Sequence, residues 1–82
     1  MTRRWLRGVV VNAAGEPVAG AHVVVVEASV PMPEIALVAD RKGSFAINLP
    51  EGRFRLRAEV TAGAGEAEAT VPGVEFVRIE VG

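Results

Sequence analysis

Three turn signatures punctuate this chain, and each is followed by a run in which apolar residues alternate with other residues. They are Gly15-Glu16-Pro17-Val18-Ala19-Gly20-Ala21, Asp40-Arg41-Lys42-Gly43-Ser44-Phe45 and Leu49-Pro50-Glu51-Gly52-Arg53-Phe54. Gly, Pro and Asp favour reversal of the chain, and a period of two in hydrophobicity is typical of a half-buried strand. We therefore predict an all-β fold, a small β-sandwich.

Length and composition fit one small domain. The chain has 82 residues, of which 50% are hydrophobic, and no Cys, so we expect a single domain over residues 1–82 without disulfides or thiolate metal ligands. A net charge of −1 gives no general attraction to nucleic acid or to an anionic membrane surface. The longest Val run, Val23 to Val26, is far shorter than the roughly 20 apolar residues of a membrane-spanning helix. We expect no nucleic-acid partner and no membrane insertion.

The start of the chain is basic but has no apolar stretch like that of a secretory signal peptide. The paired arginines Arg3 and Arg4 are therefore not interpreted as an export signal. We expect a protein that stays in the cytoplasm, one that is exported without a cleaved signal, or a domain excised from a longer chain.

Alternation and turn residues together predict seven strands. Their ranges are 5–11, 21–27, 35–39, 44–49, 53–58, 66–71 and 75–81. Residues 31–33 are predicted to form a loop because Pro does not fit a central strand, and residues 61–65 are predicted to form another loop. Seven strands at about ten-residue spacing indicate a Greek-key β-sandwich.

Seven residues are assigned structural roles in turns. They are Asn12, Gly15, Gly20, Asp40, Gly43, Pro50 and Gly52. The side chains of Asn12 and Asp40 can accept hydrogen bonds from the backbone of their own turns, and Gly15 can adopt a positive φ. We expect these residues to hold shape and to perform no chemistry.

The turn motifs resemble those of the carboxypeptidase regulatory-like domain, a member of the transthyretin-like (prealbumin-like) class of β-sandwiches. The resembling residues are Gly8-Val9-Val10-Val11-Asn12, Gly15-x-Pro17-Val18-x-Gly20-Ala21-x-Val23, Asp40-x-x-Gly43-x-Phe45 and Leu49-Pro50-x-Gly52-x-Phe54-x-Leu56. The resemblance spans nearly the whole chain, with Phe54 where the family often has Tyr. It implies a fold more than a function, because such domains occur in many unrelated proteins, often outside the cytoplasm.

The resemblance also implies how the strands divide between two sheets. The fourth, first and seventh predicted strands would form one sheet, and the third, second, fifth and sixth would form the other. The residues between the sheets would then be Leu6, Gly8, Val10, Ala21, Val23, Val25, Phe45, Ile47, Phe54, Leu56, Val77 and Ile79.

One outer surface arranged in this way is apolar. The outward positions on the sheet of the first strand are Trp5, Val9, Val11, Ala46 and Phe76, where a solvated face alternates to polar residues. Contiguous exposed apolar surface often marks a partner site, so we predict that these residues bind a partner protein or a second copy of the chain. The alternatives are that a loop or the N-terminal arm covers this face, or that Val serves strand propensity alone.

The other sheet is predicted to have a charged outer face. Arg53, Arg55 and Arg57 point outward beside Glu66 and Glu68, and the hairpin can place Arg57 opposite either glutamate. We interpret this face as solvated, with cross-strand pairs each worth roughly 0.2–1 kcal/mol. An anion-binding stripe is the alternative.

No set of residues points to catalysis or to metal binding. His22 is the only His and Asp40 the only Asp, so without Cys neither a zinc site nor a calcium cage can be assembled. Ser29 and Ser44 lack a base with an orienting partner. The hydroxyisourate hydrolases of the transthyretin-like class end in Tyr-Arg-Gly-Ser, whereas this chain has no Tyr. We predict a protein that is not an enzyme and uses no cofactor or metal.

The sequence therefore favours a non-enzymatic interaction module. A carbohydrate- or small-ligand-binding module, with Trp5 stacking on a sugar ring, is the second hypothesis. Sugar platforms usually combine several aromatic residues with Asn, Asp or Gln, and this chain has one Trp, no Tyr and no Gln.

Overall fold

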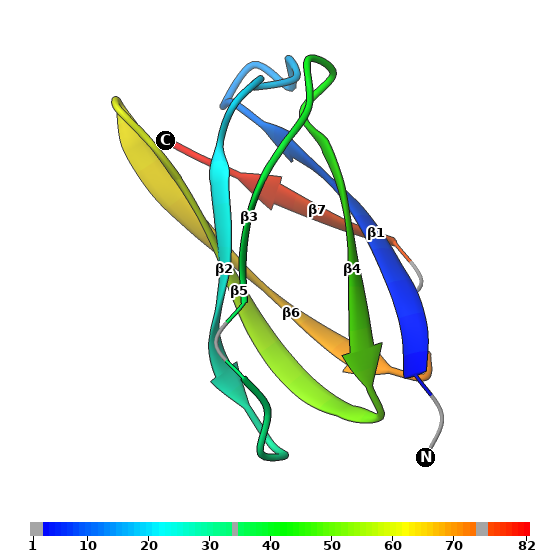
Figure 1. The fold of residues 1–82 in the computed structure, drawn as a ribbon. Helices are drawn as coiled ribbons and strands as arrows, with labels where there is room; N and C mark the ends of the chain where they lie inside the picture. The colour runs from blue at the N-terminus through cyan, green and yellow to red at the C-terminus, as the bar shows by residue number, and fades with distance from the viewer. Residues whose placement is uncertain (1–2, 34, 74–75) are drawn as a thin grey trace.

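The computed structural model describes residues 3–33, 35–73 and 76–82, and these residues form seven strands and no helix (Figure 1). The strands are β1 (Arg3–Val11), β2 (His22–Ala28), β3 (Ala36–Val38), β4 (Ser44–Pro50), β5 (Gly52–Val60), β6 (Gly63–Val71) and β7 (Phe76–Glu80). The prediction of an all-β fold is confirmed. This part of the chain accordingly holds no helix long and apolar enough to cross a membrane.

The strands form two facing sheets, one of three strands in the order β4-β1-β7 and one of four strands in the order β3-β2-β5-β6. Neighbouring strands are antiparallel except β1 and β7, which are parallel. Figure 1 shows the three-stranded sheet on the right and the four-stranded sheet on the left, with the β5–β6 hairpin reaching beyond the sandwich at the upper left. The division of strands implied by the family resemblance is confirmed.

Alternate residues of both sheets point into one hydrophobic core. Its buried members are Leu6, Val10, Ala21, Val23, Ala39, Phe45, Ile47, Leu49, Phe54, Leu56, Ala58, Ala69, Val71, Val77, Ile79 and Val81. Gly8 is buried among them because the ring of Phe45 occupies the space of a side chain, and a Cβ built at Gly8 would lie 2.3 Å from Cζ of Phe45. The predicted core is confirmed apart from Val25, and it is larger than predicted.

A β-bulge accounts for the exception at Val25. The register between β2 and β5 shifts between Val25 and Glu27, so the strict alternation of buried and exposed positions is lost there. Val25 is half-buried and packs against the core from its margin. Sequence alternation alone does not reveal where an extra residue enters a strand.

The predicted loop at residues 61–65 is too long, because only residues 61 and 62 form the turn and β6 already begins at Gly63. Strands β5 and β6 pair without interruption from Gly52 and Val71 to Val60 and Gly63. The glycines at the start of β6 serve close packing instead, since a Cβ on Gly65 would lie 1.8 Å from the carbonyl oxygen of Glu80. These glycines let the backbone after β7 lie against β6 where the two sheets meet.

The smaller differences concern the ends of strands. The third strand is shorter than the predicted 35–39, and the first, fourth and fifth strands are longer than predicted. The start of the seventh strand was predicted at residue 75, which lies outside the described residues. Pro50 ends β4 and Gly52 begins β5, so the chain passes from one sheet to the other through a single residue, as the third turn signature predicts.

The two polar turn residues act as predicted. Oδ1 of Asn12 accepts hydrogen bonds from the backbone N–H groups of Ala14 (2.9 Å) and Glu16 (3.0 Å). Oδ1 of Asp40 accepts equivalent bonds from Lys42 (2.8 Å) and Ser44 (2.9 Å). Both turns are thus closed by a side chain that replaces missing backbone partners.

The glycine of the second turn is required for two reasons. Gly43 has φ +72°, and a Cβ there would lie 2.6 Å from the carbonyl oxygen of Val10. Its own carbonyl accepts a 2.8 Å hydrogen bond from the N–H of Val10. The turn therefore locks the start of β4 onto the end of β1.

Candidate interaction surface

The outward side chains of β4, β1 and β7 form a surface that we name the aromatic face. In register, Trp5 lies opposite Asn48, Arg7 opposite Ala46 and Val9 opposite Ser44 across the β1–β4 pair. Across the β1–β7 pair, Arg7 lies beside Phe76, and Val9 lies beside Arg78. The aromatic face therefore consists of three rows of side chains, with β1 in the middle.

The two large aromatic side chains on this face are exposed. Trp5 is 60% and Phe76 is 59% accessible, whereas Phe45, on the inner side of the same sheet, is buried. Ala46 is exposed and Val9 is half-buried. The predicted outward positions of these four residues are confirmed, although whether they bind a partner stays a prediction.

The prediction that Val11 belongs to the exposed surface is wrong. Val11 is only 4% accessible, although its position in the strand places it on the outer side. The loop after β1 folds back over it: Val11 forms a β-bridge with Pro17, and the N–H of Val18 donates a 2.9 Å hydrogen bond to the carbonyl of Val10. Part of the apolar surface predicted for docking is thus covered by the chain itself.

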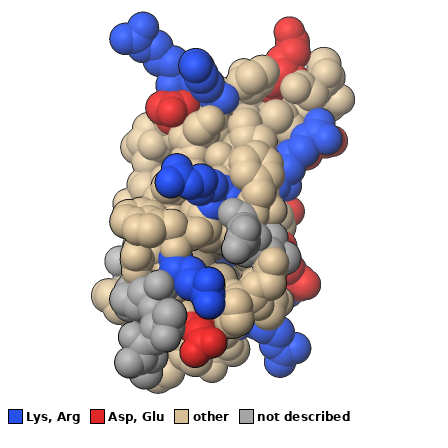
Figure 2. All heavy atoms as spheres, turned by 90° about the vertical axis from the view of Figure 1, so that its right-hand side faces the viewer, with Lys and Arg blue, Asp and Glu red and all other residues tan. Residues whose placement is uncertain are grey.

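Two arginines on the aromatic face were missed by the sequence interpretation. Arg7 and Arg78 are both exposed, and neither side chain forms an ion pair or a hydrogen bond within the described residues. The alternation that identified Trp5 and Val9 also places Arg7 outward, so the signal was present. Figure 2, which looks onto the β4 and β1 side, shows several groups of Lys and Arg spheres with uncharged surface between them, and some of these groups lie against Asp or Glu spheres.

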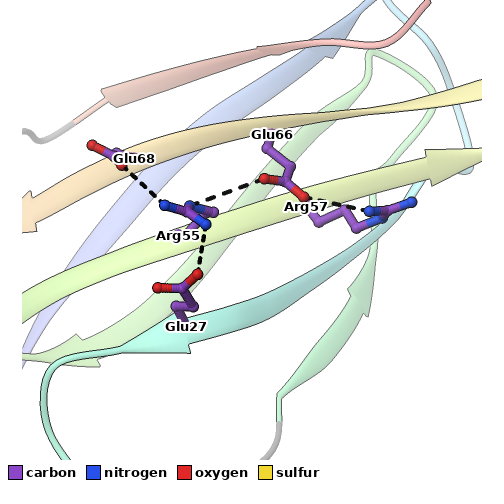
Figure 3. A network of polar contacts seen from close by, with 5 residues as sticks. All are labelled: Glu27, Arg55, Arg57, Glu66 and Glu68. Carbon is purple, nitrogen blue, oxygen red and sulfur yellow. Dashed lines mark hydrogen bonds and ion pairs between the residues drawn. The ribbon is translucent and has the colours of Figure 1, made fainter.

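The outward side chains of β2, β5 and β6 form the opposite surface, which we name the ion-pair face. Arg55 lies opposite Glu68, and Arg57 lies opposite Glu66. Arg55 contacts Glu27 at 2.5 Å, Glu68 at 3.5 Å and Glu66 at 4.0 Å, and Arg57 contacts Glu66 at 3.3 Å (Figure 3). Arg57 also contacts Glu59 at 3.8 Å. The predicted cross-strand pairing is confirmed, and the register decides which glutamate faces which arginine.

The ion-pair face has the properties of a solvated surface. All of its paired side chains are between 38% and 79% accessible, and exposed pairs of this kind contribute about 0–1 kcal/mol each. Because Arg55 has three carboxylates near it and Arg57 is paired with Glu66 (Figure 3), these two arginines do not form an open anion-binding stripe. Arg53, the third arginine of the predicted stripe, is exposed and has no ion pair in the described part of the chain.

The other polar residues considered as candidate site residues either form hydrogen bonds that stabilise the fold or are exposed to solvent. His22 is exposed and lies between Val38 and Glu59 in register. Oγ of Ser29 accepts a 2.8 Å hydrogen bond from the N–H of Arg53, which ties the end of β2 to the start of β5. Within residues 3–33, 35–73 and 76–82, no group of three or more His, Asp or Glu side chains is placed to hold a metal.

One open hollow lies at the end of the sandwich where the loop after β1 meets the β5–β6 turn. It has a volume of about 950 Å³, and His22 and Glu59 are among the residues on its wall. Ligand pockets enclose most of their ligand and aim several polar groups at it. Asn12, also on this wall, already uses its Oδ1 within its own turn. The hollow is a broad concavity between loops rather than an enclosed ligand pocket.

A comparison with models of protein families gives a match. The family model of the carboxypeptidase regulatory-like domain matches residues 6–81, which is nearly the whole chain. No curated protein matches the sequence at a significant level.

Proposed function

Because the chain belongs to the carboxypeptidase regulatory-like domain family, we propose that it is a non-catalytic β-sandwich module that docks on a partner protein, or on a second copy of itself, through the aromatic face. The observation that carries this proposal is the exposure of Trp5 and Phe76 on one face. Trp, Tyr, Phe and Arg are enriched at protein interfaces, and energetic hot spots are enriched in Trp, Tyr and Arg.

The position of these residues within a rigid sheet supports the proposal. Trp5 and Phe76 are on β1 and β7, which are paired in register, and the backbone below them is fixed by the sheet and the core. A preformed surface binds without the entropic cost of ordering a loop. The small side chain of Ala46, opposite Arg7 on β4, leaves room for a partner to approach that arginine.

The same geometry supports a role without chemistry. Two of the polar residues considered for catalysis are placed far from each other: Ser29 follows the last residue of β2 and is hydrogen-bonded to Arg53, whereas His22 begins β2 at the opposite end of the strand. A nucleophile needs a base within hydrogen-bond reach. These residues therefore do not assemble into an acid–base pair.

Photo-crosslinking in cells that express the protein naturally tests the docking surface. A photoreactive phenylalanine analogue at position 5 or 76 is expected to capture one defined protein partner or a second copy. The matched control is position 26, since Val26 is 43% accessible but lies on the four-stranded sheet, away from the aromatic face. Equal crosslinking from position 26, or none from positions 5 and 76, would contradict the proposal.

A carbohydrate-binding module is the second candidate, and one observation favours it. Asn48 lies opposite Trp5 in register, and Phe76 is on the same face, so the structure brings together two aromatics and an amide that are distant in sequence. A glycan array distinguishes the candidates. Binding of a glycan that is lost in Trp5→Ala and retained in Trp5→Phe, with no crosslinked protein, would favour the sugar-binding function.

A further inference from the structure

We propose that the aromatic face binds an acidic segment of a partner protein. In this segment, Asp or Glu carboxylates lie among apolar side chains. This inference rests on the proposed docking function and specifies the chemistry of the partner. The argument comes from the surroundings of Arg7 and Arg78 and from the contrast with the ion-pair face.

Arg7 is placed at the centre of the aromatic face. It lies between Ala46 on one side and Phe76 on the other in register, and Trp5 and Val9 are two residues away along the same strand. Neighbouring strands are about 4.8 Å apart and residues i and i+2 about 6.8 Å apart. The strand positions that flank Arg7 therefore carry apolar or small side chains, and on the β4 side Arg7 also lines a shallow hollow that includes Leu37 and Asp40.

Arg78 adds a second positive charge on the next strand. It lies beside Val9 in register, and a Cβ built at Gly15 would lie 3.4 Å from its Nη2 atom, so the side chain extends toward the loop that covers Val11. The two arginines are one strand and two residues apart, which is about 8 Å between their Cα atoms. A single extended segment of a partner can reach both.

No ion pair within the described residues neutralises these two charges. Glu80, at the end of β7, is the acidic residue among the outward strand positions of the aromatic face, and Asp40 lines the same hollow as Arg7, but neither forms an ion pair with Arg7 or Arg78. On the ion-pair face, in contrast, Arg55 alone has three carboxylates within 4.0 Å. Within the described residues, Arg55 and Arg57 are therefore ion-paired, whereas Arg7 and Arg78 are not.

An arginine between aromatic rings is suited to a carboxylate from a partner. The planar guanidinium group binds carboxylates through two parallel hydrogen bonds, and the bond strengthens when apolar neighbours exclude water. An apolar partner surface without acids would bury the charge of Arg7 unpaired, which is costly. A basic partner surface would be repelled.

Binding of designed peptides measures this preference. The probes are three extended 12-residue peptides in which Leu alternates with Glu, with Lys or with Ser, titrated against the full chain. Trp5 is the only Trp, so its fluorescence reports binding at this face. We expect the Glu peptide to bind at least tenfold more tightly than the other two, and its affinity to fall as the salt concentration rises.

Two variants separate the roles of charge and of apolar contact. Arg7→Gln is expected to weaken the Glu peptide about tenfold, whereas Arg53→Gln, a control on the four-stranded sheet, is expected to change its affinity less than twofold. Arg7→Glu combined with Arg78→Glu is expected to reverse the preference in favour of the Lys peptide. Such a reversal is not produced by partial unfolding.

The outcomes that overturn the inference are distinct from those that overturn the docking function. Equal affinity for the Glu, Lys and Ser peptides, no binding of any of them, or an affinity unchanged in Arg7→Gln contradicts an acidic partner. If crosslinks from positions 5 and 76 persist under those results, the aromatic face still docks, but on a partner of different chemistry. Loss of those crosslinks removes the docking function itself.

Discussion

The outer faces of the two sheets differ in how they satisfy their charged residues. On the ion-pair face, Arg55 and Arg57 are surrounded by glutamates of the same molecule. On the aromatic face, Arg7 lies beside Phe76 and has no ion pair in the described residues. Both faces expose large hydrophobic side chains, since Val26 and Val38 are exposed on the four-stranded sheet as Trp5 and Phe76 are on the other.

This difference teaches that exposure of apolar residues alone does not identify an interface. Single exposed hydrophobic residues are common on soluble proteins. The aromatic face is distinguished by the size of its exposed side chains and by two arginines without an ion pair in the described part of the chain. Under the proposed function, a partner would supply Arg7 and Arg78 with carboxylates like those that Arg55 and Arg57 receive from their own molecule.

The largest expected effect on the free energy of unfolding comes from comparing a buried Phe on the inner side of the three-stranded sheet with an exposed Phe on its outer side. Phe45→Ala removes a buried ring that also covers Gly8, and we expect the free energy of unfolding to fall by about 4 kcal/mol. Phe76→Ala is the matched control, because the same side chain is removed from the solvent side, with an expected loss of less than about 0.5 kcal/mol. Urea unfolding followed by circular dichroism measures both. A loss above about 2 kcal/mol in Phe76→Ala would show that this ring is part of the fold.

A smaller loss is expected where the two sheets meet. Gly65→Ala places a methyl group against the carbonyl oxygen of Glu80, with a 1.8 Å approach that only a shift of the backbone can relieve. We expect a loss of about 3 kcal/mol, measured by the same urea unfolding. Gly82→Ala is the control, since nothing lies within 4 Å of a Cβ at that position. Equal stability of the two variants would mean that β6 and the C-terminal segment do not pack closely.

A moderate loss is expected from the turn that connects the four-stranded to the three-stranded sheet. Asp40→Ala removes the acceptor of two backbone hydrogen bonds, and we expect a loss of about 1 kcal/mol in the free energy of unfolding. Asp40→Asn keeps an acceptor oxygen and is expected to recover most of this loss. Thermal melting compares the three proteins, and an Asn variant as unstable as the Ala variant would contradict the turn-capping role.

The smallest effect on stability compares the arginines of the two faces directly. Arg55→Gln removes three ion pairs of exposed side chains, so we expect a loss of about 0.5–1 kcal/mol at low salt that shrinks as salt is added. Arg7→Gln removes no ion pair of the described residues and is expected to leave stability unchanged at every salt concentration. Salt-dependent melting of Arg7→Gln would reveal an internal partner and weaken the contrast between the faces.

Much of the fold could be predicted from the sequence because its signals are local. Asn12 and Asp40 fold their turns with bonds to residues two and four positions away, and strand alternation places Leu6 inside and Trp5 outside. The role of the glycines of β6 could not be predicted, because the group that leaves no room for a side chain there is the carbonyl of Glu80, which is distant in sequence. A glycine in a turn and a glycine under a neighbouring backbone look the same in one sequence.

The candidate surface was predicted only in part for a similar reason. Alternation identified Trp5, Val9 and Phe76 as outward, but the cover over Val11 depends on a loop that folds back to place Pro17 beside it. The neighbourhood of Arg7 and Phe76 depends on the parallel pairing of the first and last strands. Only the three-dimensional register shows that the exposed aromatics are grouped with Arg7 and Arg78, which have no ion pair among the described residues.

The size of the complex formed in the native cell tests the central claim, which is that the aromatic face is the docking surface. Gentle lysis and size-exclusion chromatography would compare the natural chain with two double variants, Trp5→Glu with Phe76→Glu and Val26→Glu with Val38→Glu. Each pair replaces the exposed large hydrophobic residues of one sheet. We expect the Val variant to elute with the natural complex and the aromatic variant to elute as the free, folded domain. Retention of the complex by the aromatic variant, or its loss in the Val variant, would contradict the assignment of the docking surface.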